Sequence, residues 1–187
     1  MGSQDESDVS YNTESEDNIK IPESLPEIPE SDRSFVYYSG YLDTKTGRIE
    51  KIRLSKELQE LTYKYCEAYG APYEAVMAIM GVETGWNADI GVSKNGKYYG
   101  IGMLNIEYNE KPLKDMGITL QTPHGGIKGT CIVFASKYKE FGDIEKAMIA
   151  YNGGSSYART LFSHGVTSTS YSRKAKSIMN ALIVGEQ

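Results

Sequence analysis

The spacing of hydrophobic residues changes from a strand pattern to a helical one near residue 54. Aromatic and aliphatic residues alternate with polar ones over residues 35–54, on both sides of the turn-forming run at residues 43–47. That alternation predicts a β-hairpin. From Ser55 onward the hydrophobic residues recur every three or four positions, which predicts a helix that ends at Gly70.

Four further segments share the helical spacing. Their predicted beginnings are Pro72, Pro123 after a capping Thr122, the residue after a capping Asp143, and about Ser170. Gly85 ends the first of these helices, and the last one runs to Val184. The residues expected to face inward are Val76, Met77, Ile79, Met80, Ile127, Cys131, Phe134, Tyr138, Ile144, Ala147, Met148, Tyr151, Ala175, Ile178, Met179 and Leu182.

Residues 87–100 lack helical spacing and are rich in turn-forming residues. Within them, residues 94–97 are typical of a two-residue hairpin connection, so we expect a small β-ribbon there. The sequence contains no internal repeat and no apolar run long enough to span a membrane. The pattern as a whole predicts a mainly α fold with a small β-hairpin.

Composition separates the first 33 residues from the rest of the chain. They carry ten acidic and two basic side chains and are rich in Ser and Pro, so they cannot bury enough apolar surface to offset the entropy of ordering. We expect residues 1–33 to be a disordered acidic linker and residues 34–187 to form one folded domain. Residues 1–6 lack the basic and apolar regions of a signal peptide, and residues 1–3 are interpreted as an expression remnant in place of a native leader or membrane anchor.

The remaining 154 residues carry fifteen acidic and eighteen basic side chains, a mildly basic balance that suits an anionic surface such as a cell wall. The basic residues form no stripe interleaved with aromatic residues, so nucleic-acid binding has no support. Cys66 and Cys131 both fall in predicted helices, where two buried thiols are favoured over a disulfide. Neither has the spacing of a metal site with His124 or His164, and no metal or cofactor is expected.

Glu83 is the residue whose position suggests chemistry. It follows Met80 by three residues, Ile79 by four and Val76 by seven, so a helix would place its carboxyl on the apolar face. Burial there would disfavour the ionised form and raise the pKa of the carboxyl, as a general acid requires. On this pattern alone, a Glu at a helix end that turns to solvent is the simpler interpretation.

Other segments change that balance because they resemble, in order, the motifs of one enzyme family. They are residues 82–87, residues 100–106, the helix opening at residues 123–129, residues 150–154, and residues 169–171 followed by Lys174. Together they resemble the lytic transglycosylases of the soluble-transglycosylase type, a goose-lysozyme-like family, over roughly residues 55–184.

The resemblance implies an α+β lysozyme-like fold, a helical bundle around a glycan-binding groove, with Glu83 as the catalytic acid. The residues that it matches to substrate-binding positions are Thr84, Met103, Asn105, Tyr151, Asn152 and Tyr171. Thr84 stands where the family has Ser. Asn105 stands where the family has Gln, and its amide is one methylene shorter.

The resemblance also implies the reaction, which is cleavage of the β-1,4 bond between N-acetylmuramic acid and N-acetylglucosamine. Glu83 would protonate the glycosidic oxygen, and its carboxylate would then take the proton from the muramic acid 6-hydroxyl as this group attacks C1. The product would be a 1,6-anhydromuramyl end. Two alternatives stay open: a hydrolytic muramidase in which Asp89 or Glu107 positions water, and an inactive scaffold that binds the wall.

Several residues near these motifs also fit a structural role. Tyr151 and Tyr171 fit core packing as well as substrate contact, and Asn152 fits a left-handed helix C-cap. Trp86, Tyr98 and Tyr99 fit packing better than stacking on sugar rings.

The implied substrate is the glycan strand of bacterial peptidoglycan, so we expect an exported protein that faces the cell wall. Wall lyases of this kind serve conjugation systems, secretion systems and phage particles. The sequence does not choose among these partners.

Overall fold

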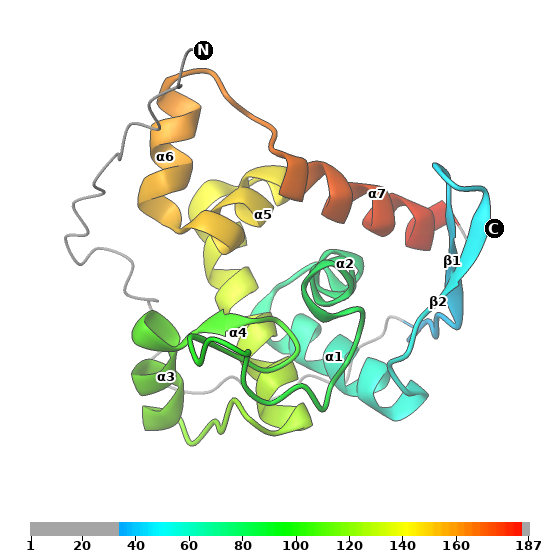
Figure 1. Ribbon diagram of the computed structural model, residues 1–187, viewed down its shortest axis with the longest axis horizontal. Coiled ribbons are helices and arrows are strands. Elements are labelled where there is room, and N and C mark those ends of the chain that lie inside the picture. The colour runs from blue at the N-terminus through cyan, green and yellow to red at the C-terminus, as the bar shows by residue number, and fades with distance from the viewer. Residues whose placement is uncertain (1–33, 185–187) are drawn as a thin grey trace, which may run out of the picture.

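The computed structural model describes residues 34–184, and these form seven helices and two short antiparallel sheets (Figure 1). In chain order the elements are β1 (Gly40–Asp43), β2 (Arg48–Lys51), α1 (Lys56–Tyr69), α2 (Tyr73–Thr84), β3 (Tyr98–Tyr99), β4 (Leu104–Asn105), α3 (Ile106–Asp115), α4 (Pro123–Phe141), α5 (Ile144–Gly153), α6 (Ser155–Ser163) and α7 (Ser170–Val184). The prediction of a mainly α fold with a small β-hairpin is therefore confirmed. The expected linker at residues 1–33 lies outside the described residues.

Helix α2 forms the centre of the fold. Figure 1 shows it end-on, with α7 above it and α1 below it, and it also contacts α4. Tyr73 and every residue from 75 to 80 are buried, so the helix is covered on all sides. Its last turn, which carries Glu83, is the part that leaves this core.

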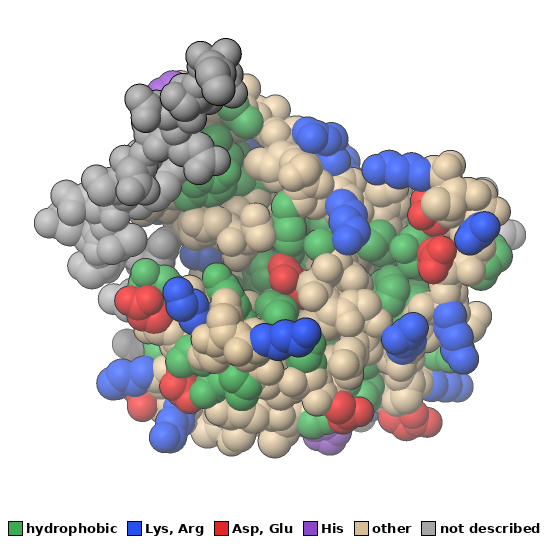
Figure 2. All heavy atoms as spheres, in the orientation of Figure 1, with side chains coloured by type: hydrophobic (Ala, Val, Ile, Leu, Met, Phe, Trp, Pro, Cys, Tyr) green, Lys and Arg blue, Asp and Glu red, His purple; other side chains and the backbone are tan. Residues whose placement is uncertain are grey.

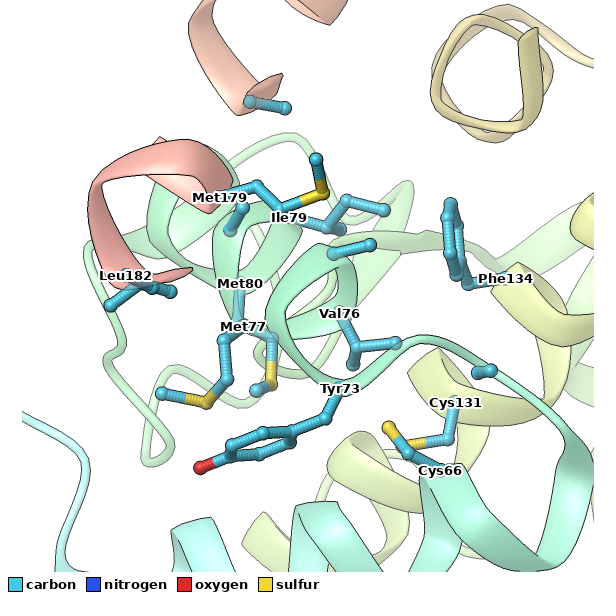
Figure 3. Close-up of a cluster of buried hydrophobic side chains, with 14 of the residues drawn as sticks. Cys66, Tyr73, Val76, Met77, Ile79, Met80, Cys131, Phe134, Met179 and Leu182 are labelled. Carbon is cyan, nitrogen blue, oxygen red and sulfur yellow. The ribbon is translucent and has the colours of Figure 1, made fainter. Parts of the chain in front are cut away.

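The cysteines lie in the same core, where Figure 3 shows their sulfur atoms side by side. Cys66 on α1 and Cys131 on α4 are both buried and free, with 3.8 Å between the two Sγ atoms. The preference for two buried thiols over a disulfide is confirmed.

Most predicted helix boundaries are confirmed by capping interactions. The Ser55 hydroxyl accepts a hydrogen bond from the Leu58 N–H at the start of α1, and Thr122 and Asp143 cap α4 and α5 in the same way. Gly70 ends α1 in the left-handed conformation. One boundary differs, because Pro72 is the N-cap of α2 and the first helical residue is Tyr73.

The predicted hairpin is present, with Gly40 opposite Lys51 and Asp43 opposite Arg48. It packs against α7. The small ribbon expected within residues 87–100 is also present, since Val92 pairs with Tyr99, but its connection at residues 94–97 has four residues rather than two, and β3 pairs with β4 as well. The Ser93 N–H donates to the Tyr98 carbonyl across that connection at 2.8 Å.

Helices α3 and α6 were not predicted from the sequence. In α3 the Pro112 ring removes one main-chain donor from the helix interior, a feature that normally indicates a helix end. In α6 the apolar residues Ala158, Leu161 and Phe162 recur at helical spacing, but the helix is only nine residues long and no side chain caps its start, so the local signal is weak. Within residues 34–184, no helix combines the length and the apolar character needed to cross a membrane.

Candidate functional site

Glu83 lies in the last turn of α2, where two successive residues in the left-handed conformation turn the chain away. Gly85 has a φ of 61° and Trp86 has a φ of 61°. Trp86 is buried, and its indole N–H donates to the Met77 carbonyl at 2.9 Å. Gly81 makes this packing possible, since a Cβ at residue 81 would lie 2.4 Å from the Trp86 ring. The expected packing role of Trp86 is confirmed.

The Glu83 carboxyl is largely withdrawn from water and has one defined partner. The Tyr171 hydroxyl, from the first turn of α7, donates to Glu83 Oε1 at 2.7 Å. Burial raises the pKa of Glu83 above its ordinary value, while the Tyr171 hydrogen bond and the charge of Lys174 act in the opposite direction. The net direction is the one expected of a general acid that works near neutral pH.

A cavity of about 490 Å³ opens beside Glu83. Its walls are formed by Glu83, Tyr98, residues 103–105, Tyr108, Asn109, Val133, Lys137 and residues 150–154. A volume of this size is typical of sites that bind small ligands or one part of a larger one. On the face in Figure 2, hydrophobic side chains extend across the middle of the surface, and separate Lys and Arg side chains border them.

Tyr151 joins the cavity wall to the loop before β4. Its hydroxyl donates to the Gly102 carbonyl at 2.7 Å, and its ring lies 6.3 Å from that of Phe134. Burial and the nearby charge of Glu83 raise the pKa of Tyr151 well above its ordinary value, so the phenol stays protonated and remains a donor. The residue thus packs against the core and also lines the cavity.

Thr84 follows Glu83 in the chain, but it is not one of the described residues that line the cavity. Its hydroxyl lies 2.9 Å from the Ile101 carbonyl and 3.1 Å from the Met80 carbonyl. These contacts tie the loop at residues 100–103 to α2. The substrate-binding role of Thr84 stays a prediction. In the structure its hydroxyl positions the loop against α2.

Met103 and Asn105 both line the cavity, and the backbone near each residue has a distinctive feature. Met103 has a φ of 49°, a conformation that is uncommon for residues other than glycine. The Asn105 Oδ1 accepts a hydrogen bond from the Glu107 N–H at 3.0 Å and so caps α3. The donor end of the Asn105 amide is not used by this cap, and its expected contact with substrate stays a prediction.

Asn152 lies inside α5, and Gly154 is the residue that caps this helix. The alternative that Asn152 is a left-handed C-cap is therefore wrong. Its side chain is exposed and lines the cavity next to Gly153. Gly153 lets α6 approach closely, since a Cβ there would lie 2.2 Å from the Tyr157 ring.

The two neighbouring tyrosines of β3 have different surroundings. Tyr98 lines the cavity, whereas Tyr99 packs against the smaller core cluster that includes Leu104 and Leu113. Packing is therefore confirmed for Tyr99, and Tyr98 is the one of the pair that a ligand in the cavity would meet.

Among residues 34–184, no second carboxylate of the kind that ordinary glycosidases require lines this cavity. Asp89 and Glu107 are both exposed, and neither lines it. Glu83 is thus the single acidic residue among the described residues of the wall. Within the same part of the chain, no group of three His, Cys, Asp or Glu side chains could hold a metal ion.

Sequence reasoning missed four residues of the cavity wall. Tyr108 and Asn109 come from α3, and Val133 and Lys137 come from one face of α4. The first two were missed because Pro112 obscured the helix that carries them. The spacing of four between Val133 and Lys137 was a signal, since it places both side chains on the same side of α4.

Comparisons with known proteins identify the fold and the family. An inactive mutant of the lytic transglycosylase Slt from Pseudomonas aeruginosa, known from an X-ray structure, superposes with a TM-score of 0.55 at 16% sequence identity. The match covers 72% of this chain and 24% of that one, so the chain spans about a quarter of the solved enzyme. This likeness shows a shared fold, and it confirms the expected lysozyme-like class.

No curated protein matches the sequence. The family model of the transglycosylase SLT domain matches residues 60–168, which is more than half of the chain and includes Glu83, the cavity loop and α5. The chain therefore belongs to the transglycosylase SLT domain family.

Proposed function

We propose that this protein is a peptidoglycan lytic transglycosylase in which Glu83 is the catalytic acid and base. The observation that carries the proposal is the position of Glu83, which is the one acidic side chain among the described residues that line a cavity of about 490 Å³. Its carboxyl accepts a hydrogen bond from Tyr171 and has a raised pKa. A raised pKa favours the protonated carboxyl, which can donate a proton and becomes a base after donating it.

The reaction breaks one bond and forms another without consuming water. Glu83 gives its proton to the glycosidic oxygen between N-acetylmuramic acid and N-acetylglucosamine, and the C1–O4 bond breaks. The 6-hydroxyl of the same muramic acid then attacks C1 and gives its proton to the Glu83 carboxylate. The products are a free 4-hydroxyl and a 1,6-anhydromuramyl end, and Glu83 returns to its protonated form.

Tyr171 is suited to both halves of this cycle. Its hydroxyl donates to Glu83 Oε1, so it holds the carboxyl in one orientation and stabilises the ionised form after proton transfer. Burial and the charge of Glu83 raise the pKa of Tyr171, which keeps the hydroxyl protonated at any physiological pH. Tyr171 lies outside the segment matched by the family model, so its assignment depends on this contact.

Asn105, Met103, Asn152 and Tyr151 are proposed to contact the sugar rings, because all four line the cavity beside Glu83. Preorganised polar groups of this kind lower the barrier by orienting the substrate and by stabilising charge that develops at C1. The caps and contacts that hold Asn105 and Tyr151 support such preorganisation.

The hydrolytic alternative is less well supported. Retaining and inverting glycosidases place two carboxylates about 5 to 10 Å apart around the scissile bond. The candidates for a second one, Asp89 and Glu107, are exposed and do not line the cavity.

Peptidoglycan as substrate implies that the protein acts outside the cytoplasmic membrane. Service to a conjugation system, a secretion system or a phage particle is part of the same proposal.

The test is to digest purified peptidoglycan and identify the new ends by mass spectrometry. We expect 1,6-anhydromuramyl ends, which are lighter than reducing ends by one water molecule. Glu83→Gln should abolish their release, and Asp89→Asn, which alters an exposed carboxyl outside the cavity, should release them as the parent does. Reducing muramic acid ends, or equal release by Glu83→Gln and the parent, would refute the proposal.

A further inference from the structure

Lys137 is a buried cation in the wall of the cavity that contains Glu83. It is 7% exposed and lies on α4, one turn after Val133, which lines the same wall. Among the described residues of the wall it is the only cation, as Glu83 is the only anion. The described part of the wall therefore presents one acidic and one basic side chain, from two different helices.

A chain of hydrogen bonds fixes the Lys137 ammonium at the start of α6. Lys137 Nζ donates to Ser155 Oγ at 2.8 Å, and the Ser155 hydroxyl in turn donates to Glu140 Oε2 at 2.7 Å. Arg159 forms an ion pair with the other Glu140 oxygen at 2.6 Å. The ammonium is therefore next to Ser155, the residue that follows Gly153 and Gly154 in the chain. These two glycines form part of the cavity wall.

Burial of a lysine needs a physical reason, because withdrawing an ammonium from water is costly. An aliphatic side chain at residue 137 would fill the same side of α4, as Val133 does one turn earlier. Arg159, whose side chain is 54% exposed, already supplies Glu140 with a cation from α6. Lys137 differs from Arg159 in being buried and in lining the cavity.

The proposed substrate provides a group that such a cation would recognise. In a peptidoglycan strand only alternate sugars, the muramic acids, carry a lactyl carboxyl, which is either a free carboxylate or the attachment point of a peptide with its own carboxylates. The N-acetylglucosamine units between them are neutral. A fixed ammonium in the wall of the cavity that Glu83 also lines can therefore distinguish the two kinds of sugar by charge.

We propose that Lys137 binds a carboxylate carried by the muramic acid unit and so sets the register of the glycan strand, which decides the bond that reaches Glu83. This inference rests on the proposed function and deepens it. Lys137 is a substrate-binding residue here, and the hydrogen bonds through Ser155 to Glu140 hold its ammonium in place. Because the contact is made to ground state and transition state alike, its loss should raise KM and leave kcat nearly unchanged.

The experiment compares two substrates, each in two chemical forms. Strands that carry their peptides and strands stripped of peptides by an amidase are used as they are and after conversion of their carboxyl groups to methylamides. For the parent enzyme, blocking the carboxyl groups should raise KM about 10- to 100-fold, the range expected for loss of a charged hydrogen bond. The effect should appear with stripped strands if the lactyl carboxylate is bound, and with peptide-bearing strands if a peptide carboxylate is bound.

The variants are Lys137→Met, Lys137→Arg and, as a matched control on the exposed side of the same helix, Lys139→Met. We expect Lys137→Met to raise KM for unblocked strands by the factor that blocking produces, and to show no further change when the strands are blocked. Lys137→Arg should retain much of the discrimination because it keeps the charge, and Lys139→Met should behave as the parent does.

Two results would overturn the inference. One is a KM of the parent enzyme that does not change when the carboxyl groups of the strands are blocked. This measurement needs no variant, so misfolding of a variant cannot affect it. The other is a Lys137→Met variant that loses the same factor on blocked and unblocked strands, since that result assigns Lys137 to maintenance of the wall alone.

A binding measurement separates this inference from the proposed chemistry. Glu83→Gln and the double variant Glu83→Gln with Lys137→Met can be titrated with unblocked strands. Weaker binding by the double variant supports the role of Lys137 even if the parent releases reducing ends. Equal binding refutes that role even if the parent releases anhydro ends.

Discussion

Gly102 is the position at which the smallest substitution should disturb the candidate site most. A Cβ built on Gly102 would lie 2.1 Å from Thr130 Oγ1 and 2.5 Å from the Tyr151 hydroxyl. Neither atom can move aside easily, since Thr130 is fully buried on α4 and the Tyr151 hydroxyl is hydrogen bonded to the Gly102 carbonyl. The loop at residues 100–103 must therefore shift away from α4 and α5 when residue 102 becomes alanine.

The expected cost has two parts. Overpacking a fitted core by one methyl group costs about 1–3 kcal/mol. Loss of the hydrogen bond between the Tyr151 hydroxyl and the Gly102 carbonyl adds about 1 kcal/mol. Gly102→Ala should thus lower the free energy of unfolding by about 2–4 kcal/mol and the melting temperature by roughly 5–15 °C. Release of muropeptides should fall as well, because the shift displaces Met103 from the cavity wall.

Thermal unfolding followed by circular dichroism measures this cost, and a double-mutant cycle with Thr130→Ala identifies its source. Thr130→Ala removes the atom nearest to the new methyl group, so the combined variant should be more stable than the sum of the single costs by about 1 kcal/mol or more. Costs that simply add, or a melting temperature for Gly102→Ala within about 1 °C of the parent, would refute the close packing on which the reasoning depends.

Three further predictions concern other parts of the site and core. The Tyr171 hydrogen bond favours ionised Glu83, so Tyr171→Phe should raise the pKa of Glu83. Activity that needs protonated Glu83 is lost as pH rises through this pKa, so the alkaline limb of the pH–rate profile should move to higher pH; an unmoved or lowered limb contradicts this. Asn105→Ala should cost about 1 kcal/mol in denaturant unfolding, because it removes the cap of α3, and no loss would exclude the cap. Burial raises the pKa of the Cys66 thiol and shields Cys131, so a thiol reagent should label neither cysteine before unfolding and both after it; labelling of the native protein would contradict that burial.

The parts of the fold that were predicted from the sequence are those specified by neighbouring residues. Ser55, Thr122 and Asp143 cap helices through hydrogen bonds to residues three positions away, so the signal and its effect lie in the same few residues. The same holds for Gly70 and Gly85, which end helices in a left-handed conformation that few other residues adopt. The position of Glu83 at the end of α2 could be predicted for this reason.

The surroundings of Glu83 could not be predicted from local patterns. Its hydrogen-bond partner, Tyr171, comes from a helix 88 residues later in the chain. The hydroxyl of Thr84 is adjacent in sequence, yet it bonds to the carbonyl of Ile101 and leaves the cavity wall to other residues. Ordered motifs suggested which of these residues belong to one site, but only the packing of α2 against α7 and the loop decides which atom each side chain reaches.

The burial of Lys137 could not be predicted from local patterns either. In the sequence, a lysine four residues after Val133 interrupts an apolar face and favours an exposed position. In the fold, α6 places Ser155 next to that lysine, and the Ser155 hydroxyl connects it to Glu140, so the ammonium can be buried with a hydrogen-bond acceptor. Because α6 is only nine residues long and no side chain caps its start, the local signal for the helix that makes this burial possible is weak. A buried cation one turn after a buried valine is the kind of departure from local rules that functional sites show.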